Sequence, residues 1–278
     1  MGLETGDDTV FITGATSGFG EYVATKLASR GGALLLHGRS ASKLASVAAK
    51  LTHSFPQTKI DTFLADFADL DQVASMTKAI AAAYPKIDIL INNAGVGFGA
   101  PPYTEREVGR AGYELRLTVN YLAPYLLTRQ LMPLMKAAAK ARIINVASIG
   151  QSPIDYTNIL LEHGYDGTRA YGQSKLALIM ATFDWAEELA GSNVTVNAIH
   201  PATYAATQMT QEAGIAPLAT VSSGGDPIVW LATSPELNHK TGGFYNQRSN
   251  VPANPQAYDL EARTALRRYT DQLLSTYH

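Results

Sequence analysis

Short apolar runs alternate with longer amphipathic segments along most of the chain. Runs that are apolar nearly throughout, and rich in β-branched or leucine residues, are typical of strands buried on both faces of a sheet. The predicted strands are residues 9–13, 33–37, 59–64, 87–91, 142–147, 194–199 and 243–246. The helical segments run from the glycine-rich loop to residue 30, and then over residues 41–53, 70–84, 111–139, 170–190 and 255–274.

Strands that alternate with helices predict right-handed β-α-β crossovers. We therefore expect an α/β Rossmann fold, a doubly wound parallel sheet of about seven strands with helices on both faces. The continuous pattern favours one domain over residues 1–278, with a C-terminal helical extension at 255–278 whose helix, over residues 255–274, we expect to be amphipathic and solvated. Residues 97–110, 151–168 and 203–226 have no clear period and are predicted loops. In such sheets ligands bind outside the carboxyl ends of the strands.

Composition narrows the class of protein. With 46% hydrophobic residues, the 278-residue chain can bury a sizeable core. A net charge of −2 does not indicate the basic surface that would bind nucleic acid or an anionic membrane. The absence of cysteine excludes disulfides and thiolate chemistry. No signal peptide or membrane span is evident, and the histidines lack metal-ligand spacing, so we expect a soluble cytoplasmic protein without a metal.

The stretch TGATSGFG, from Thr13 to Gly20, follows the first predicted strand and opens the first helix. Gly14 can adopt a positive φ angle, Gly18 lets the backbone approach a pyrophosphate, and Gly20 allows close packing of helix on sheet. Backbone N–H groups and the helix dipole would face the anion. At this position, nucleotide binding is favoured over a simple tight turn.

The end of the second strand bears on the choice of cofactor. The stretch LLLHGRS has no acidic residue to accept hydrogen bonds from the ribose hydroxyls of NAD. It has Arg39, which could pair with a 2′-phosphate. The alternative is an exposed arginine in a β–α loop. We favour NADP(H) over NAD(H).

The stretch RAYGQSKLA places Tyr171 and Lys175 four residues apart. On a helix, both side chains lie on one face. A neighbouring ammonium group favours the phenolate and lowers the tyrosine pKa, which would suit Tyr171 to proton transfer. An aromatic ring packed on a lysine stem is the other interpretation of this pair.

Four further motifs follow in a fixed order. They are NNAG, which ends at Gly95, TVNYLAPYLLTR around Asn120, NVAS, which ends at Ser148, and Tyr171-x-x-x-Lys175. Together with TGATSGFG, they resemble the short-chain dehydrogenase/reductase family from about Val10 to Tyr245. The long loop before Tyr171 is most similar to the retinol dehydrogenase-like branch.

The resemblance implies a role for each residue of a catalytic set. Tyr171 would exchange a proton with the substrate oxygen, and Lys175 would lower the Tyr171 pKa and hold the nicotinamide ribose. Ser148 would donate a hydrogen bond to the substrate oxygen, and Asn120 would help to hold a water that relays protons to Lys175. The implied activity interconverts a ketone or aldehyde and an alcohol, with the hydride carried by the nicotinamide.

The same resemblance implies the cofactor contacts. The residues so assigned are Gly14, Ser17, Gly18, Phe19, Gly20, Arg39, Asp66, Phe67, Asn93, Ala94, Gly95, Tyr171, Lys175, Pro201, Thr203 and Thr207. Asp66 could also be an N-cap of the following helix. The family often has Pro-Gly-x-x-x-Thr after the sixth strand, whereas HPATYAATQM departs from it. Thr203 and Thr207 therefore both stay open as the residue that contacts the carboxamide.

The spacing between Ser148 and Tyr171 is longer than is usual in the family. The inserted loop, residues 151–168, carries Ile154, Tyr156, Ile159, Leu160 and Tyr165. These side chains could wall a pocket for a bulky apolar substrate, bury a surface loop, or cover a subunit interface. The sequence leaves all three open.

We also expect a homo-oligomer, formed through helices at about 112–139 and 170–190 as the resemblance implies. Two other functions compete with an oxidoreductase. One is a catalytically idle dinucleotide-binding sensor or scaffold, and the other is a nucleotide-sugar epimerase or dehydratase with tightly held NAD. The retained Tyr171 and Lys175 argue against the first, and the form of the glycine loop argues against the second.

Overall fold

The computed structural model describes residues 8–277. Residues 1–7 and His278, the last residue of the predicted C-terminal extension, lie outside the described residues. An eight-stranded sheet has the order β3-β2-β1-β4-β5-β6-β7-β8. Its strands are β1 (Thr9–Ile12), β2 (Ala33–Gly38), β3 (Lys59–Leu64), β4 (Ile89–Asn92), β5 (Ala141–Val146), β6 (Val194–His200), β7 (Phe244–Asn246) and β8 (Ser249–Asn250). Strands β1 to β7 are parallel and β8 is antiparallel, which confirms the predicted doubly wound sheet and adds one short edge strand.

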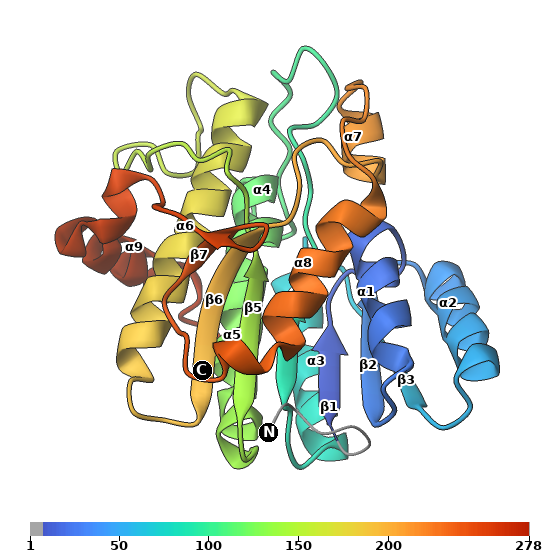
Figure 1. Ribbon diagram of the computed structural model, residues 1–278. Coiled ribbons are helices and arrows are strands. Elements are labelled where there is room, and N and C mark those ends of the chain that lie inside the picture. Colours follow the sequence, from blue (N-terminus) through green and yellow to red (C-terminus); the bar gives the residue numbers. More distant parts are fainter. Residues whose placement is uncertain (1–7, 278) are drawn as a thin grey trace.

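Helices cover both faces of this sheet (Figure 1). They are α1 (Gly18–Ala28), α2 (Ala41–Ser54), α3 (Leu70–Ala83), α4 (Leu115–Leu117), α5 (Ala123–Ala137), α6 (Gly167–Glu188), α7 (Gln208–Glu212), α8 (Val221–Thr233) and α9 (Leu260–Leu273). Within the described residues, no helix is long and apolar enough to cross a membrane.

The sheet divides the core into two layers because successive strand residues point to opposite faces. In β1, Phe11 faces the layer that contains α3, α5, α6 and α9. Its neighbours Val10 and Ile12 face the layer that contains α1, α2 and α8. The same alternation in the other central strands explains why their sequences are apolar without a polar face.

The chain winds away from β1 in both directions, so the loops after β1 and β4 diverge. Such a switch point leaves a crevice at the carboxyl end of the sheet. Asn93 holds the two loops together, since its Nδ2 donates to the carbonyls of Thr13 (2.9 Å) and Gly14 (3.2 Å). Both motifs that the sequence assigned to a nucleotide therefore meet at this crevice.

Helix α8 corrects the prediction of a loop over residues 203–226. Gly224, Gly225 and Pro227 have poor helix propensity, which hid this helix in the sequence. The two glycines face α1: a Cβ on Gly224 would lie 2.4 Å from Phe19, and a Cβ on Gly225 would lie 2.2 Å from Tyr22. Close packing of α8 on α1 therefore requires the same two glycines whose low helix propensity predicted a loop.

The helical region predicted at 111–139 begins only at Leu115. Residues Thr118–Leu122 form a π-helical turn, η1, between α4 and α5. Pro124 follows in the first turn of α5 and cannot donate to the carbonyl of Asn120. The turn that holds Asn120 thus departs from regular α-helix, as π-bulges at functional sites often do.

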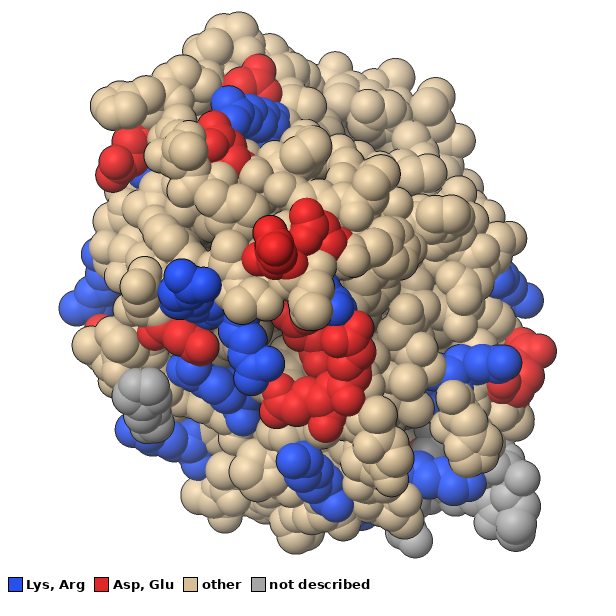
Figure 2. Space-filling view, turned by 90° about the vertical axis from the view of Figure 1, so that its left-hand side faces the viewer, with Lys and Arg blue, Asp and Glu red and all other residues tan. Residues whose placement is uncertain are grey.

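Helix α9 is packed, although the sequence predicted a solvated helix. Leu266 is 1% exposed, and Thr270 shares a 2.7 Å hydrogen bond with the buried Tyr121 hydroxyl. Arg263 pairs with Asp184 (3.4 Å) and Glu187 (2.8 Å) of α6. Helix α9 thus occupies part of the surface through which the sequence predicted association of subunits. Figure 2, viewed from this side, shows acidic and basic side chains interspersed over it.

Candidate functional site

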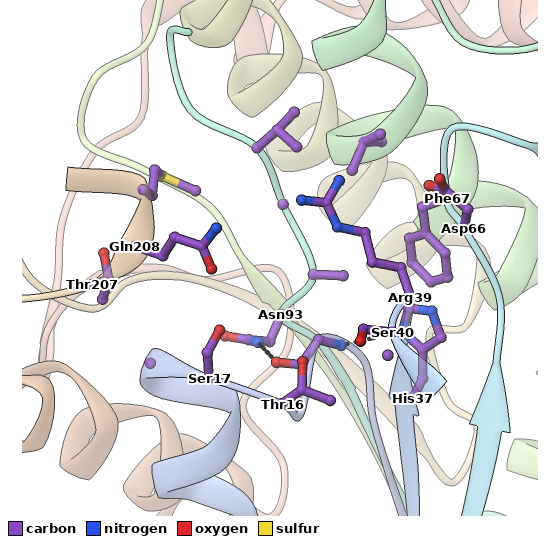
Figure 3. Close-up of a pocket in the computed structure, with 18 of the residues that line it drawn as sticks. Thr16, Ser17, His37, Arg39, Ser40, Asp66, Phe67, Asn93, Thr207 and Gln208 are labelled. Carbon is purple, nitrogen blue, oxygen red and sulfur yellow. Dashed lines mark hydrogen bonds between the residues drawn. The ribbon is translucent and has the colours of Figure 1, made fainter. Parts of the chain in front are cut away.

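A cavity of about 280 Å³ opens at the carboxyl ends of β1, β2, β3 and β4. Among the residues that the sequence assigned to a cofactor, those that line it are Gly14, Ser17, Gly18, Phe19, Arg39, Asp66, Phe67, Asn93, Ala94, Gly95 and Thr207. In Figure 3, Arg39 extends from the end of β2, with Asp66 and Phe67 on one side of the cavity and Thr207 and Gln208 on the other. Five segments far apart in sequence therefore build one elongated site.

The glycine loop has the geometry that a bound phosphate needs. Gly14 (φ +66°) and Gly18 (φ +54°) adopt left-handed backbone that other residues rarely take. A Cβ on Gly20 would lie 2.0 Å from the Gly14 carbonyl oxygen, so Gly20 acts in packing and does not line the cavity. The side chain of Ser17, the N-cap of α1, makes no capping hydrogen bond. The first N–H groups of α1 thus face the cavity without a side-chain cap, as an anion site requires.

Two cations stand on the β2 side of this cavity. Arg39 is exposed, and within residues 8–277 it has no hydrogen-bond or ion-pair partner. Lys43 lines the same cavity from the first turns of α2. The sequence interpretation missed Lys43, which lies in the first turn of α2, just after the loop that carries Arg39. Both cations are available to a phosphate.

Asp66 lies where the resemblance placed it, but its side chain is already engaged. The carboxylate accepts a hydrogen bond from the Ala68 N–H (2.9 Å). The N-cap of α3 is Asp69, whose side chain accepts from the Asp71 N–H, so the N-cap alternative for Asp66 was wrong. Phe67 lies 4.2 Å from the His37 ring in a stacked arrangement.

His37 links the glycine loop to the end of β3. Its Nδ1 accepts from the Gly14 N–H (3.2 Å), so its Nε2 carries the hydrogen and donates to the Ala65 carbonyl (3.0 Å). Burial lowers the pKa of this histidine to about 4, against smaller opposing effects of Ala65 and Asp66. His37 is therefore neutral in the folded protein and holds Gly14 in place.

A second cavity, of about 200 Å³, adjoins the first. Phe19, Asn93, Thr207 and Met209 line both, so the two cavities lie side by side and share these residues as a wall. Of the residues that the sequence selected, the second cavity is lined in addition by Ser148, Tyr171, Lys175, Pro201 and Thr203. The structure thus brings together three of the four residues assigned to catalysis.

Tyr171 and Lys175 lie together on α6, as the four-residue spacing predicts. The Lys175 Nζ is 5.7 Å from the centre of the Tyr171 ring and donates to the Val146 carbonyl (2.9 Å). The expected lowering of the Tyr171 pKa is wrong. Burial raises the pKa of Tyr171 above its usual value, and a hydrogen bond with Ser148 only partly opposes this. Burial also lowers the pKa of Lys175 to about 8, which weakens its effect as a cation.

Asn120 lines neither cavity, because its amide is committed to the loop after β4. Its Oδ1 accepts from the Val96 N–H (2.8 Å), and its Nδ2 donates to the Val96 carbonyl and to the Ser174 hydroxyl (both 3.0 Å). A Cβ on Gly95 would lie 3.0 Å from the Asn120 Oδ1 and 3.5 Å from the Lys175 Nζ. Asn120 therefore lies near Lys175 across Gly95, without direct contact.

The two threonines that the sequence left open occupy different places. The Thr203 Oγ1 is 3.0 Å from the Nε2 of His200, and the side chain is exposed. Thr207 lies over the glycine loop, where its Cγ2 is 3.3 Å from the position of a Cβ on Gly18. Since Thr207 also lines both cavities, it is the better placed of the two to reach a ligand that spans them.

The inserted loop does not wall the second cavity. Ile154 and Ile159 are buried in the core, and the Tyr156 hydroxyl donates to the Ala262 carbonyl of α9 (2.6 Å). The apolar wall comes from other loops. Its large side chains are Phe98, Ile149, Tyr204, Met209 and Ile215. Sequence reasoning missed these residues because they lie in segments without a period.

Among residues 8–277, no three His, Asp or Glu side chains are grouped as a metal site would require. The geometry instead combines an anion-binding glycine loop, two cations, and a tyrosine beside a buried serine and lysine, at two adjoining cavities. Such a set can hold a dinucleotide with its reactive end beside a proton donor.

Comparison with known proteins gives consistent matches. A family model described as short chain dehydrogenase matches residues 8–216. Human retinol dehydrogenase 13 is 36% identical over 233 residues, which is 82% of this chain and 69% of the relative. A protein of Streptomyces sp. (strain C5), named as a candidate daunorubicin C-13 ketoreductase, is 33% identical over 263 residues, 90% of this chain and 87% of the relative.

Two solved structures illustrate the likeness in three dimensions. A short-chain dehydrogenase from Escherichia coli CFT073, complexed with NADPH, has a TM-score of 0.72 at 24% identity and covers 88% of this chain and 98% of its own. A metagenomic short-chain oxidoreductase in complex with NADP has a TM-score of 0.68 at 27% identity and covers 90% of this chain and 100% of its own.

Proposed function

Because this chain belongs to the short-chain dehydrogenase/reductase family, we propose that it is an NADP(H)-dependent oxidoreductase that interconverts a carbonyl compound and an alcohol, with Tyr171 as general acid and base. The observation that carries the proposal is the meeting of Ser148, Tyr171 and Lys175 at a cavity that adjoins the glycine-loop cavity. A bound nicotinamide would supply or accept the hydride.

The protein residues then manage the substrate oxygen and its proton. The Ser148 Oγ accepts from the Gly150 N–H (3.0 Å), which leaves its own O–H to donate to the substrate oxygen. Burial keeps the Tyr171 phenol protonated, so it is ready to donate when a carbonyl is reduced. Charge that develops on the substrate oxygen lies in a site of low polarity, where these two donors act strongly.

The preference for NADP(H) rests on the cations at the end of β2. Arg39 and Lys43 line the cavity and have no carboxylate partner within residues 8–277. A 2′-phosphate would pair with Arg39 through two parallel hydrogen bonds and with Lys43 as a point charge. NADPH or NADP in the two similar structures supports the same choice.

The substrate class follows from the second cavity. Its large apolar side chains include Phe98, Tyr204 and Met209, which favour an apolar substrate with one polar group at Tyr171. Names of the relatives refer to retinol and to a daunorubicin ketone, both bulky. We propose an apolar ketone, aldehyde or secondary alcohol as the substrate.

Absorbance at 340 nm tests this function directly. NADPH should be consumed in the presence of an apolar ketone or aldehyde, and Tyr171→Phe should reduce kcat/KM by about 100-fold or more, the usual contribution of a general acid. The variant should still bind NADPH, measured by quenching of protein fluorescence. Binding without turnover of any carbonyl or matching alcohol would replace the enzyme proposal with a cofactor sensor.

A further inference from the structure

A charged cluster is buried behind the active site, on the far side of the loop that follows β4. Arg116 is 2% exposed and Glu114 is 1% exposed, although both lie in or beside a single turn of helix, α4. The Arg116 Nη1 is 3.5 Å from the Glu114 Oε1, and its Nη2 is 2.7 Å from Glu107. Buried charges are costly unless they are paired, so such a cluster calls for a function beyond filling space.

The guanidinium contacts the loop on both sides of Phe98. The Arg116 Nε donates to the Gly97 carbonyl (3.0 Å). On the other side, a Cβ on Gly99 would lie 2.6 Å from the Arg116 Nη2. Gly99 has φ +94°, a conformation that suits glycine. Arg116 therefore fixes the backbone immediately before and after Phe98.

Phe98 faces the reacting end of the site. Its ring packs edge-to-face on Tyr171, with 4.8 Å between ring centres and an angle of 78° between the planes. It also forms part of the wall of the second cavity. The position of this ring thus limits the space beside the Tyr171 phenol on one side.

The inserted loop braces the same segment from outside. The Tyr165 hydroxyl donates to the Glu114 Oε1 (3.1 Å), and burial together with Glu114 raises the pKa of this phenol, which keeps it a donor. Arg106 donates twice to the Leu160 carbonyl (both 3.1 Å). At the start of α6, a Cβ on Gly167 would lie 2.2 Å from the Phe98 carbonyl oxygen. The insertion therefore braces the loop that carries Phe98, in addition to the hydrogen bond that the Gln151 Nε2 donates to the Ser148 carbonyl (3.1 Å).

From these contacts we propose that Phe98 determines which substrates fit beside Tyr171, and that buried Arg116, held by Glu114 and the inserted loop, is the positioning residue that fixes Phe98. The proposal rests on the oxidoreductase function proposed above. It assigns to the insertion an indirect effect on substrate selection, in place of the direct pocket wall that its apolar residues suggested.

The test compares a compact ketone, acetophenone, with a bulky one, benzophenone. Phe98→Leu should raise the kcat/KM ratio of bulky to compact ketone by about tenfold, since a changed pocket contact of this size is worth that much discrimination. Arg116→Met should shift the ratio in the same direction, mainly through the KM of benzophenone. In the double variant, Arg116→Met should add nothing to Phe98→Leu, because both act through the same ring.

The matched control is Arg263→Met, which removes another buried arginine with two carboxylate partners, on α9. It should leave the ratio unchanged. Effects of Arg116→Met and Phe98→Leu that multiply in the double variant would overturn the proposal, as would an Arg116→Met variant that slows both ketones equally. If Arg116→Met does not fold, Tyr165→Phe removes only the hydroxyl on Glu114 and should move the ratio the same way by about twofold.

A crystal structure of the Arg116→Met variant separates this proposal from the oxidoreductase function. Displacement of Phe98 from the Tyr171 ring supports the positioning function even if neither ketone is reduced. An unchanged edge-to-face contact contradicts it, whatever the activity. Failure of the native protein to turn over any carbonyl contradicts only the proposed chemistry.

Discussion

His37 predicts a measurable loss of stability in acid. The side chain is 3% exposed, and burial lowers its pKa from 6.5 to about 4. Below pH 6.5, His37 is protonated in the unfolded chain, whereas in the folded chain it stays mostly neutral down to about pH 4. Acid therefore favours the unfolded state, so the free energy of unfolding falls between these two values. Protonation of His37 would also place a hydrogen on Nδ1, which could then no longer accept the hydrogen bond from the Gly14 N–H.

The size of the effect follows from the two pKa values. Each unit of difference corresponds to about 1.4 kcal/mol. Between pH 7.5 and pH 5, the unfolded chain becomes almost fully protonated at His37 while the folded chain remains about nine-tenths neutral. The resulting loss is about 2 kcal/mol from this residue. His200, whose pKa is also lowered to about 4 by burial, changes with the same sign.

The perturbation is His37→Gln, which cannot titrate and offers one acceptor for Gly14 and one donor for Ala65. Urea unfolding of the native protein and the variant at pH 7.5 and pH 5 isolates the contribution, because every other group is common to both. The stability difference should move by about 2 kcal/mol in favour of the variant at pH 5. His53→Gln, on the exposed face of α2, is the control. The stability difference between this variant and the native protein should be the same at pH 7.5 and at pH 5. Equal acid losses in the native protein and the His37→Gln variant would refute the reasoning.

Three further predictions follow from other contacts. Arg39→Ala should weaken NADPH binding by about 10- to 100-fold, the value of a hydrogen bond to a charged group, and leave NADH binding unchanged in fluorescence titrations; equal losses for both would remove the 2′-phosphate assignment. Gly20→Ala should lower stability by more than about 2 kcal/mol, because its Cβ would collide with the Gly14 carbonyl, and an unchanged thermal midpoint would contradict this. Leu266→Ala should cost about 2–5 kcal/mol in urea unfolding, whereas a loss below about 1 kcal/mol would show that α9 is not packed as described.

The sequence predicted the sheet well because its central strands are buried on both faces. A short apolar run between two helical segments predicts a buried strand. In such a strand successive side chains point to opposite faces, so Phe11 faces one layer and Val10 and Ile12 face the other. Helix α8 was missed for the opposite reason. Gly224 and Gly225 allow α1 to approach α8 closely. Helix propensity describes only the local sequence, so it does not include this tertiary contact.

The candidate site divides in the same way. The glycine loop and Ser148 follow predicted strands, and Tyr171 and Lys175 lie on a helix after one, so the order of these elements placed them at one edge of the sheet. The resemblance to the family singled out Ser148. Their protonation was harder to predict. The sequence showed that Lys175 is near Tyr171, but it could not show that burial acts on both groups and raises the pKa of Tyr171 while it lowers the pKa of Lys175.

Substrate selection depends on the least predictable part of the chain. Phe98 lies in a loop without a period, and its position depends on Arg116 from α4 and, through Glu114, on Tyr165 from the insertion. Family motifs lie on helices or in the turns directly after strands, where the sequence pattern locates them, and they specify the chemistry. The pocket wall lies on loops, whose conformation is fixed by contacts between segments that are distant in the sequence. Two proteins that share every motif can therefore differ in substrate through a buried ion pair that touches neither substrate nor cofactor.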